Sequence, residues 1–149
     1  MLTMLVRAAV AWTVVGLASG LYYREMTKHF GLADAPDLAG TQLAVVHTHV
    51  LTLGTIVMLV LLALAAQFAG FGEDWRVRWG VWLWQVGLAL TTLGMLVIGS
   101  LQVSGIEGFN TPALGGVSGL GHILLTAAFV FILLGLLRAV RRRVEESSR

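Results

Sequence analysis

The chain has 149 residues, of which 57% are hydrophobic and only 12% are charged. A soluble globular domain has about 25% charged residues, so the composition excludes an ordinary soluble domain and predicts one membrane domain over residues 1–149. The chain has no cysteine, which excludes a disulfide framework and a thiolate metal site.

Four stretches are apolar and long enough to cross a membrane, which takes about 20 mostly apolar residues. They cover about residues 4–23, 40–69, 79–103 and 116–138. Segments with glycine, proline or several charges separate them. The sequence therefore predicts an all-α, integral membrane four-helix bundle. We see no cleavage site in the first span and expect it to be retained. We expect the last helix to fray after Val140, and residues 139–149 to form a basic cytoplasmic tail.

The positive charges predict how the helices are oriented. If the C-terminus is cytoplasmic, eight of the ten Lys and Arg residues fall on the inner side and only Arg24 and Lys28 fall outside. Cytoplasmic segments carry an excess of Lys and Arg, so we expect both termini in the cytoplasm. A basic cluster after an apolar helix is typical of a membrane surface, and we expect no nucleic-acid partner.

Histidines form the most unusual feature of the apolar segments. The second span contains "VVHTHVLTLG", with His47 and His49 two residues apart, and the fourth span contains His122. At 1.5 Å per residue, all three lie ~10–14 Å below the outer start of their helices. Ionisable side chains inside a membrane are costly and are typical of functional sites. The alternative is that each one is a hydrogen-bonded contact between helices.

The spacing of His47 and His49 limits what they can bind. Two residues turn an α-helix by about 200°, so the two side chains cannot hold one small ion together. Opposite faces suit two different partners, and imidazole is a common axial ligand of haem iron. We therefore predict a b-type haem held by His47, His49 and His122, for electron transfer or for binding NO or O₂. A quinone or a redox protein would then be the electron partner.

Two other functions stay open. His122 with either member of the pair could bind copper or zinc, or the chain could be a structural or assembly subunit without a cofactor. No acid–base pair, nucleophile motif or phosphate-binding loop appears in the sequence. The sequence therefore leaves open whether the protein is an enzyme.

Cations lie at the outer end of the first span. Arg24 and Lys28 are one turn apart in "YYREMTKH". Arginine pairs well with carboxylates, so both are candidates to contact haem propionates. In the alternative, they only end the helix and Arg24 pairs with Glu25 or Asp34.

Several apolar-segment residues have two interpretations each. Met95 is either an axial thioether or a gap-filling side chain, and Gln102 either binds a ligand or caps its own helix. The glycines would either form a flat slot for a cofactor or allow close helix packing. They are Gly16, Gly20, Gly80, Gly87, Gly94, Gly115, Gly116, Gly119 and Gly121.

Two resemblances follow from these motifs. "YYREMTK", "VVHTHVLTLG", "SLQVSG" and "GVSGLGHILL" together resemble a bacterial family of small four-helix membrane proteins, the domain of unknown function 2871. This resemblance covers nearly the whole chain. It implies a location in the inner membrane of a bacterium and no activity. His-x-His on the second of four helices is also similar to one four-helix arc of the haem-copper oxidase catalytic subunit, in which three arcs make twelve helices.

The second resemblance implies an assembly. Three copies of this chain would give twelve helices as a cyclic homotrimer, with His47 of one protomer facing His49 of the next across a haem. A dimer is the alternative. The third span has no histidine and no tyrosine lies near the layer, so oxygen reduction at a haem–copper centre is not expected.

Overall fold

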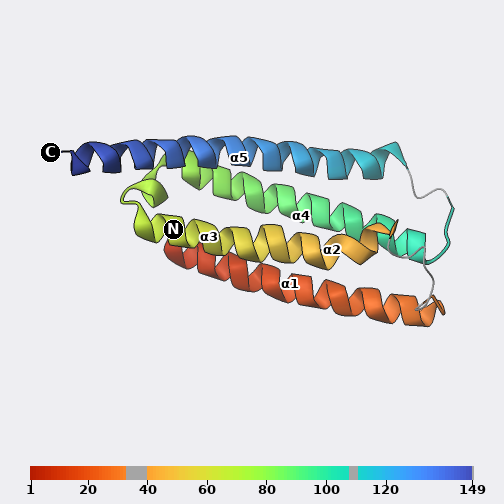
Figure 1. Cartoon of the computed structure of the whole chain (residues 1–149). Helices are drawn as coiled ribbons and strands as arrows, with labels where there is room; N and C mark the ends of the chain where they lie inside the picture. The colour runs from red at the N-terminus through yellow and green to blue at the C-terminus, as the bar shows by residue number, and fades with distance from the viewer. Residues whose placement is uncertain (33–39, 108–110, 149) are drawn as a thin grey trace.

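The computed structural model describes residues 1–32, 40–107 and 111–148, and these residues form helices and no strand. Four helices in them are long and apolar enough to cross a membrane, which confirms the predicted multi-pass helical protein. The elements are α1 (Leu2–His29), α2 (Gln42–Val50), the π-helical η2 (Leu51–Ile56), α3 (Val57–Gln67), the short 3-10 helix η3 (Phe71–Glu73), α4 (Trp75–Val103) and α5 (Pro112–Ser147), shown in Figure 1. Because α2, η2 and α3 are continuous, they make up one span.

Side chains at the helix starts explain where the helices begin. Asp74 precedes α4 and accepts a hydrogen bond from the Arg76 backbone N–H at 2.8 Å. Thr111 precedes α5, which has Pro112 in its first turn. Both are favourable choices for a helix N-terminus. The Gln102 side-chain oxygen accepts from the Gln42 N–H at 2.8 Å, so Gln102 caps the start of α2 and not its own helix, which the sequence did not predict.

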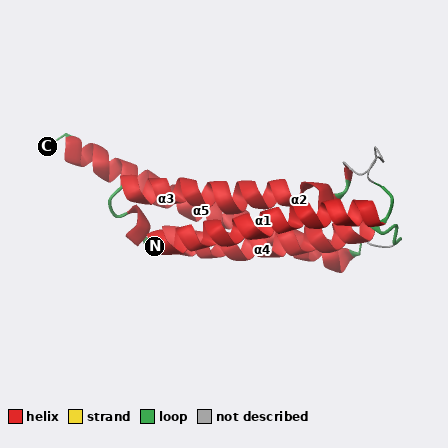
Figure 2. Cartoon of the chain, turned by 90° about the horizontal axis from the view of Figure 1, so that it is seen from below, coloured by secondary structure: helices red, strands yellow, loops and turns green. Residues whose placement is uncertain are grey.

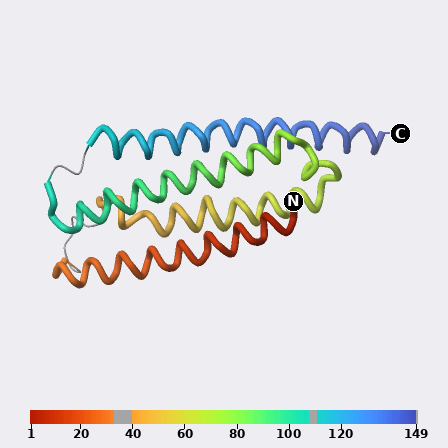
Figure 3. Tube along the Cα trace, turned by 180° about the vertical axis from the view of Figure 1, so that it is seen from behind, coloured from red at the N-terminus to blue at the C-terminus, as the bar shows by residue number. Residues whose placement is uncertain are grey.

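Each membrane span packs against the span that follows it in the sequence. α1 lies against the α2–η2–α3 span, α2 packs on α4, and α5 packs along α4 (Figures 1 and 2). Both chain termini lie at one end of the bundle together with η3, and we call this the basic end. At the other end, the histidine end, α1 and α4 finish and α2 and α5 begin. α4 and α5 diverge toward the histidine end (Figure 3).

Glycines determine how closely the helices approach. A Cβ added to Gly87 would lie 2.8 Å from the Gly121 carbonyl oxygen and 3.0 Å from the Leu125 nitrogen. Gly80 and Gly94, seven residues to either side, also face α5. The seven-residue repeat of α4 is therefore a close helix contact, and it forms no slot for a cofactor.

The second span changes its helical geometry directly after the histidines. η2 is a π-helical turn, and such turns are frequent at functional sites. The Trp84 indole N–H donates to the Leu53 carbonyl at 2.9 Å, and the hydroxyls of Thr55 and Thr13 lie 2.9 Å apart. Polar side chains of α1 and α4 therefore hold this turn.

Replacing Trp84 by phenylalanine tests that support. The change removes the donor to the Leu53 carbonyl and part of a fully buried ring. We expect a loss of about 1–2 kcal/mol of unfolding free energy, measured by thermal unfolding in detergent with circular dichroism. Trp79→Phe is the control, because Trp79 is 61% exposed. Equal melting temperatures for the two variants would contradict this role.

The last helix is longer than predicted. α5 continues to Ser147, past the expected end at Val140. The Arg143 guanidinium donates to the Gln67 carbonyl at 2.7 Å, at the end of α3. This contact with α3 helps to explain why the polar segment stays helical.

Candidate functional site

The two neighbouring histidines of α2 point to different helices. A Cβ added to Gly20 of α1 would lie 3.5 Å from the His47 Cβ. The His49 ring lies beside that of His122 on α5, with 6.4 Å between ring centroids and 53° between ring planes. The α2 backbone thus directs His47 toward α1 and His49 toward α5, as the two-residue spacing predicted.

One ring nitrogen of each α2 histidine is buried without a hydrogen-bond partner. The atoms are His47 Nδ1 and His49 Nε2, and no group in the described part of the chain pairs with them. A buried unsatisfied polar atom costs about 1–3 kcal/mol, and such an atom calls for a specific explanation. These nitrogens do not make the interhelical hydrogen bonds that a purely structural role predicts.

His122 is oriented by its own helix. Its Nδ1 lies 2.8 Å from the Ser118 carbonyl oxygen. A carbonyl can only accept, so Nδ1 carries the proton and Nε2 of the neutral ring keeps a free lone pair. Metal-binding histidines are commonly fixed in this way by a carbonyl on their other nitrogen.

The ring separation of His49 and His122 matches that of two ligands on opposite sides of one metal ion. Each metal–nitrogen bond to histidine is about 2.0–2.1 Å. Two such bonds, together with the size of two imidazole rings, give a span close to the observed 6.4 Å between centroids. The sequence predicted a shared depth for these residues, and the structure brings these two side by side.

Open glycines continue the face of α5 that carries His122. Gly119 and Gly115 lie one and two turns before His122, and an added Cβ at either would meet nothing within 4 Å. This bare backbone contrasts with the tightly packed glycines of α4. This part of α5 is therefore not covered by another helix of the described chain.

The two predicted cations lie on the side of His47. Arg24 and Lys28 follow Gly20 on α1 by one and two turns and are exposed. The Glu25 carboxylate lies 3.8 Å from each of them, so the predicted Arg24–Glu25 pair is present, and Asp34 lies outside the described residues. Exposed ion pairs contribute little stability, so both cations can still bind an anion.

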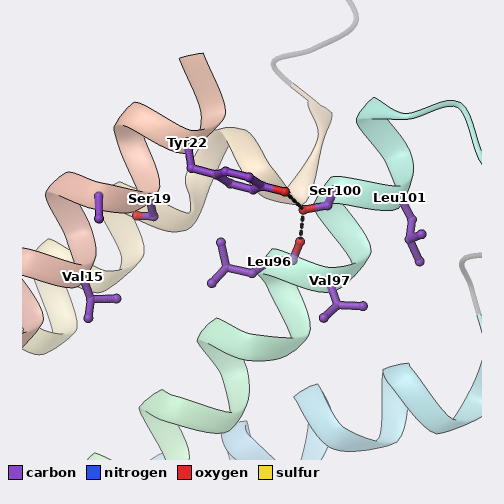
Figure 4. Close-up of a pocket in the computed structure, with 8 residues that line it drawn as sticks. Val15, Ser19, Tyr22, Leu96, Val97, Ser100 and Leu101 are labelled. Carbon is purple, nitrogen blue, oxygen red and sulfur yellow. Dashed lines mark hydrogen bonds between the residues drawn. The ribbon is translucent and has the colours of Figure 1, made fainter. Parts of the chain in front are cut away.

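A groove of about 620 Å³ lies between α1 and α4, away from the histidine rings. Figure 4 shows that its wall is apolar except for hydroxyls, with the Tyr22 and Ser100 oxygens 3.0 Å apart and Ser100 donating to the Leu96 carbonyl. No histidine, aspartate or glutamate lines it. Its chemistry is that of a lipid-facing surface, with no ligand for a metal.

Comparison with known proteins defines the family. The sequence model of a family described as protein of unknown function (DUF2871) matches residues 2–139. The chain belongs to this family. No curated protein and no solved structure matches it. Membership confirms the resemblance to this family. The likeness to one arc of the haem-copper oxidase is supported only by His47 and His49 on the second of four helices.

The structure also bears on the predicted copper or zinc site and on the role of Met95. Across residues 1–32, 40–107 and 111–148, no three His, Asp or Glu side chains gather closely enough to hold a metal ion. Met95 packs against a buried apolar cluster, which favours its gap-filling interpretation; the cluster is Leu43, Val46, Val50 and Val103.

Sequence reasoning missed the group that orients His122. That group is the backbone carbonyl of Ser118, four residues earlier on the same helix. Every helical residue has a carbonyl at this i−4 position, so the sequence does not single it out. The contact between Tyr22 and Ser100 in the groove was also missed, because it joins residues 78 positions apart.

Proposed function

We propose that this chain is a membrane-embedded b-type haem-binding protein whose haem is held by its histidine layer. The observation that carries the proposal is the buried, unpaired Nε2 of His49 beside His122, whose own Nε2 is left free by the Ser118 carbonyl. A bound haem would supply one-electron chemistry or a site for NO or O₂.

The residues present fit such a group. His49 and His122 would hold the iron, and the Ser118 carbonyl keeps the His122 ring in one orientation. Gly115 and Gly119 leave room beside His122 for a planar ring.

An assembly of several copies is a second arrangement of the same ligands. His47 faces α1 of its own chain, away from His49. In a cyclic trimer, His47 of one protomer would meet His49 of the next, and Arg24 and Lys28 would lie near the propionates. A dimer is the alternative. His49 is a ligand in both arrangements, with His122 of the same chain or with His47 of another chain.

The location follows from the charges. Arginines gather at the basic end, which holds both termini. We place that end in the cytoplasm and the histidine end in the outer half of a bacterial inner membrane. A quinone or a redox protein would exchange electrons with the haem there.

The first test is the visible spectrum of the purified protein. In detergent we expect a Soret band, sharp α and β bands after dithionite reduction, and near one iron per chain. Broad bands that change when NO is added would mean that one axial position is open, and the function would be gas binding. A protein that stays colourless after haem is added would contradict the proposal.

Copper or zinc binding is the second candidate, because His49 and His122 lie side by side. Such a site needs three or four ligands, so a second copy would have to supply the rest. Metal analysis would then find copper or zinc without a Soret band. A colourless, metal-free protein would instead indicate a structural or assembly subunit.

A further inference from the structure

A pocket of about 380 Å³ lies on the surface of α4 and α5 toward the basic end. Its α5 wall follows a helical stripe that is apolar first and basic afterwards. Leu134 and Leu137 are 49% and 48% exposed, and they are followed by Arg138 and Arg141. Arg76 of α4 completes the lining.

The pocket carries more positive charge than the chain neutralises. Asp74 Oδ2 lies 3.8 Å from the Arg76 guanidinium and 3.9 Å from that of Arg138. Asp74 Oδ1 already accepts a hydrogen bond from the Arg76 backbone N–H. No carboxylate in the described residues pairs with Arg141. Three guanidinium groups therefore face one carboxylate, and two positive charges are unbalanced.

The order of the leucines and the arginines along α5 indicates what kind of molecule fits the pocket. The exposed leucines belong to the apolar part of α5, and the arginines begin where that helix becomes polar. A molecule that satisfies both needs an anion at one end and hydrocarbon at the other. A free phosphate would leave the leucines uncovered, whereas arginine pairs well with a phosphodiester, and basic pockets between transmembrane helices bind acidic lipids.

We propose that this pocket binds one acidic phospholipid, with its phosphodiester at Arg138 and Arg141 and its acyl chains along Leu134 and Leu137. The proposal does not depend on haem binding or on which side of the membrane the basic end lies. It also gives a role to exposed arginines that the histidine layer does not use.

Native mass spectrometry of the detergent-solubilised protein tests this. We expect one phosphatidylglycerol to bind with saturation and to outcompete phosphatidylcholine. The double variant Arg138→Gln/Arg141→Gln should bind phosphatidylglycerol about 10-fold or more weakly, because each arginine at a membrane surface contributes appreciably. The control Arg7→Gln/Arg78→Gln removes the same charge from exposed residues outside this pocket and should bind as the unaltered protein does.

Arg138 also contacts Asp74, so losing Arg138 can disturb the fold as well as the pocket. The single variant Arg141→Gln leaves that contact in place and should still weaken phosphatidylglycerol binding. Circular dichroism melts would confirm that both variants are folded. Equal binding by the double variant and the unaltered protein would overturn the proposal. Equal loss in the control pair, or equal binding of phosphatidylcholine, would also overturn it by showing a non-specific charge effect.

Discussion

Replacing His49 by alanine is expected to abolish haem binding, leaving a folded protein without a Soret band. His49 belongs to the pairing with His122 inside one chain and to the pairing with His47 between chains, so either arrangement loses an axial ligand. The change also removes a buried nitrogen that has no hydrogen-bond partner, so it should not destabilise the fold. The measurement is the ratio of haem iron to protein after purification with added haem.

The other histidines distinguish the two pairings. If the ligands come from one chain, His122→Ala should lose the six-coordinate spectrum and His47→Ala should keep it. If they come from two chains, the results should be reversed. His29→Ala is the matched control, because His29 is an exposed histidine at the end of α1. A His49→Ala protein with an unchanged spectrum and iron content would exclude His49 as a ligand.

Replacing Gly87 by leucine should separate α5 from α4 and lower the stability by about 3 kcal/mol, the upper part of the range for overpacked cores. Even a Cβ at this position would lie 2.8 Å from the Gly121 carbonyl oxygen and 3.0 Å from the Leu125 nitrogen. Both are backbone atoms, so no side chain can turn aside to make room. Thermal unfolding in detergent should show the melting temperature lowered by roughly 10 °C.

Gly116→Ala is the control for this experiment. Gly116 lies on α5, and an added Cβ there would meet nothing within 4 Å. Alanine is favoured over glycine inside a helix by about 1 kcal/mol, so this variant should melt at the same temperature or slightly higher. If Gly87→Leu and Gly116→Ala have the same melting temperature, α4 and α5 do not pack as closely as described.

Hydrophobic length was enough to predict the four spans, because a membrane helix must satisfy its backbone internally and needs a fixed number of apolar residues. The histidine layer was predictable for a similar reason. Depth in a helix is a simple function of residue number, and it placed His49 and His122 at one level. The opposite directions of His47 and His49 likewise follow from helical geometry alone.

Contacts between distant segments could not be predicted. Glycine permits either a cofactor slot or a close helix contact, and only the neighbouring helix decides between them. Gly87 meets the backbone of α5 while Gly119 meets nothing, although both occur in similar apolar sequence. The extension of α5 to Ser147 depends on Arg143 reaching the Gln67 carbonyl, 76 residues away.

The π-helical turn η2 divides the second span into two halves, α2 and α3. The side chains of α3 are rotated about the helix axis relative to where the pattern of α2 would place them. Each residue added to a helix rotates everything beyond it by about 100°, so a helical wheel drawn through the whole span assigns the residues after Ile56 to the wrong side. Insertions or deletions inside η2 would therefore re-aim the histidine pair relative to α3 while each half keeps its own sequence.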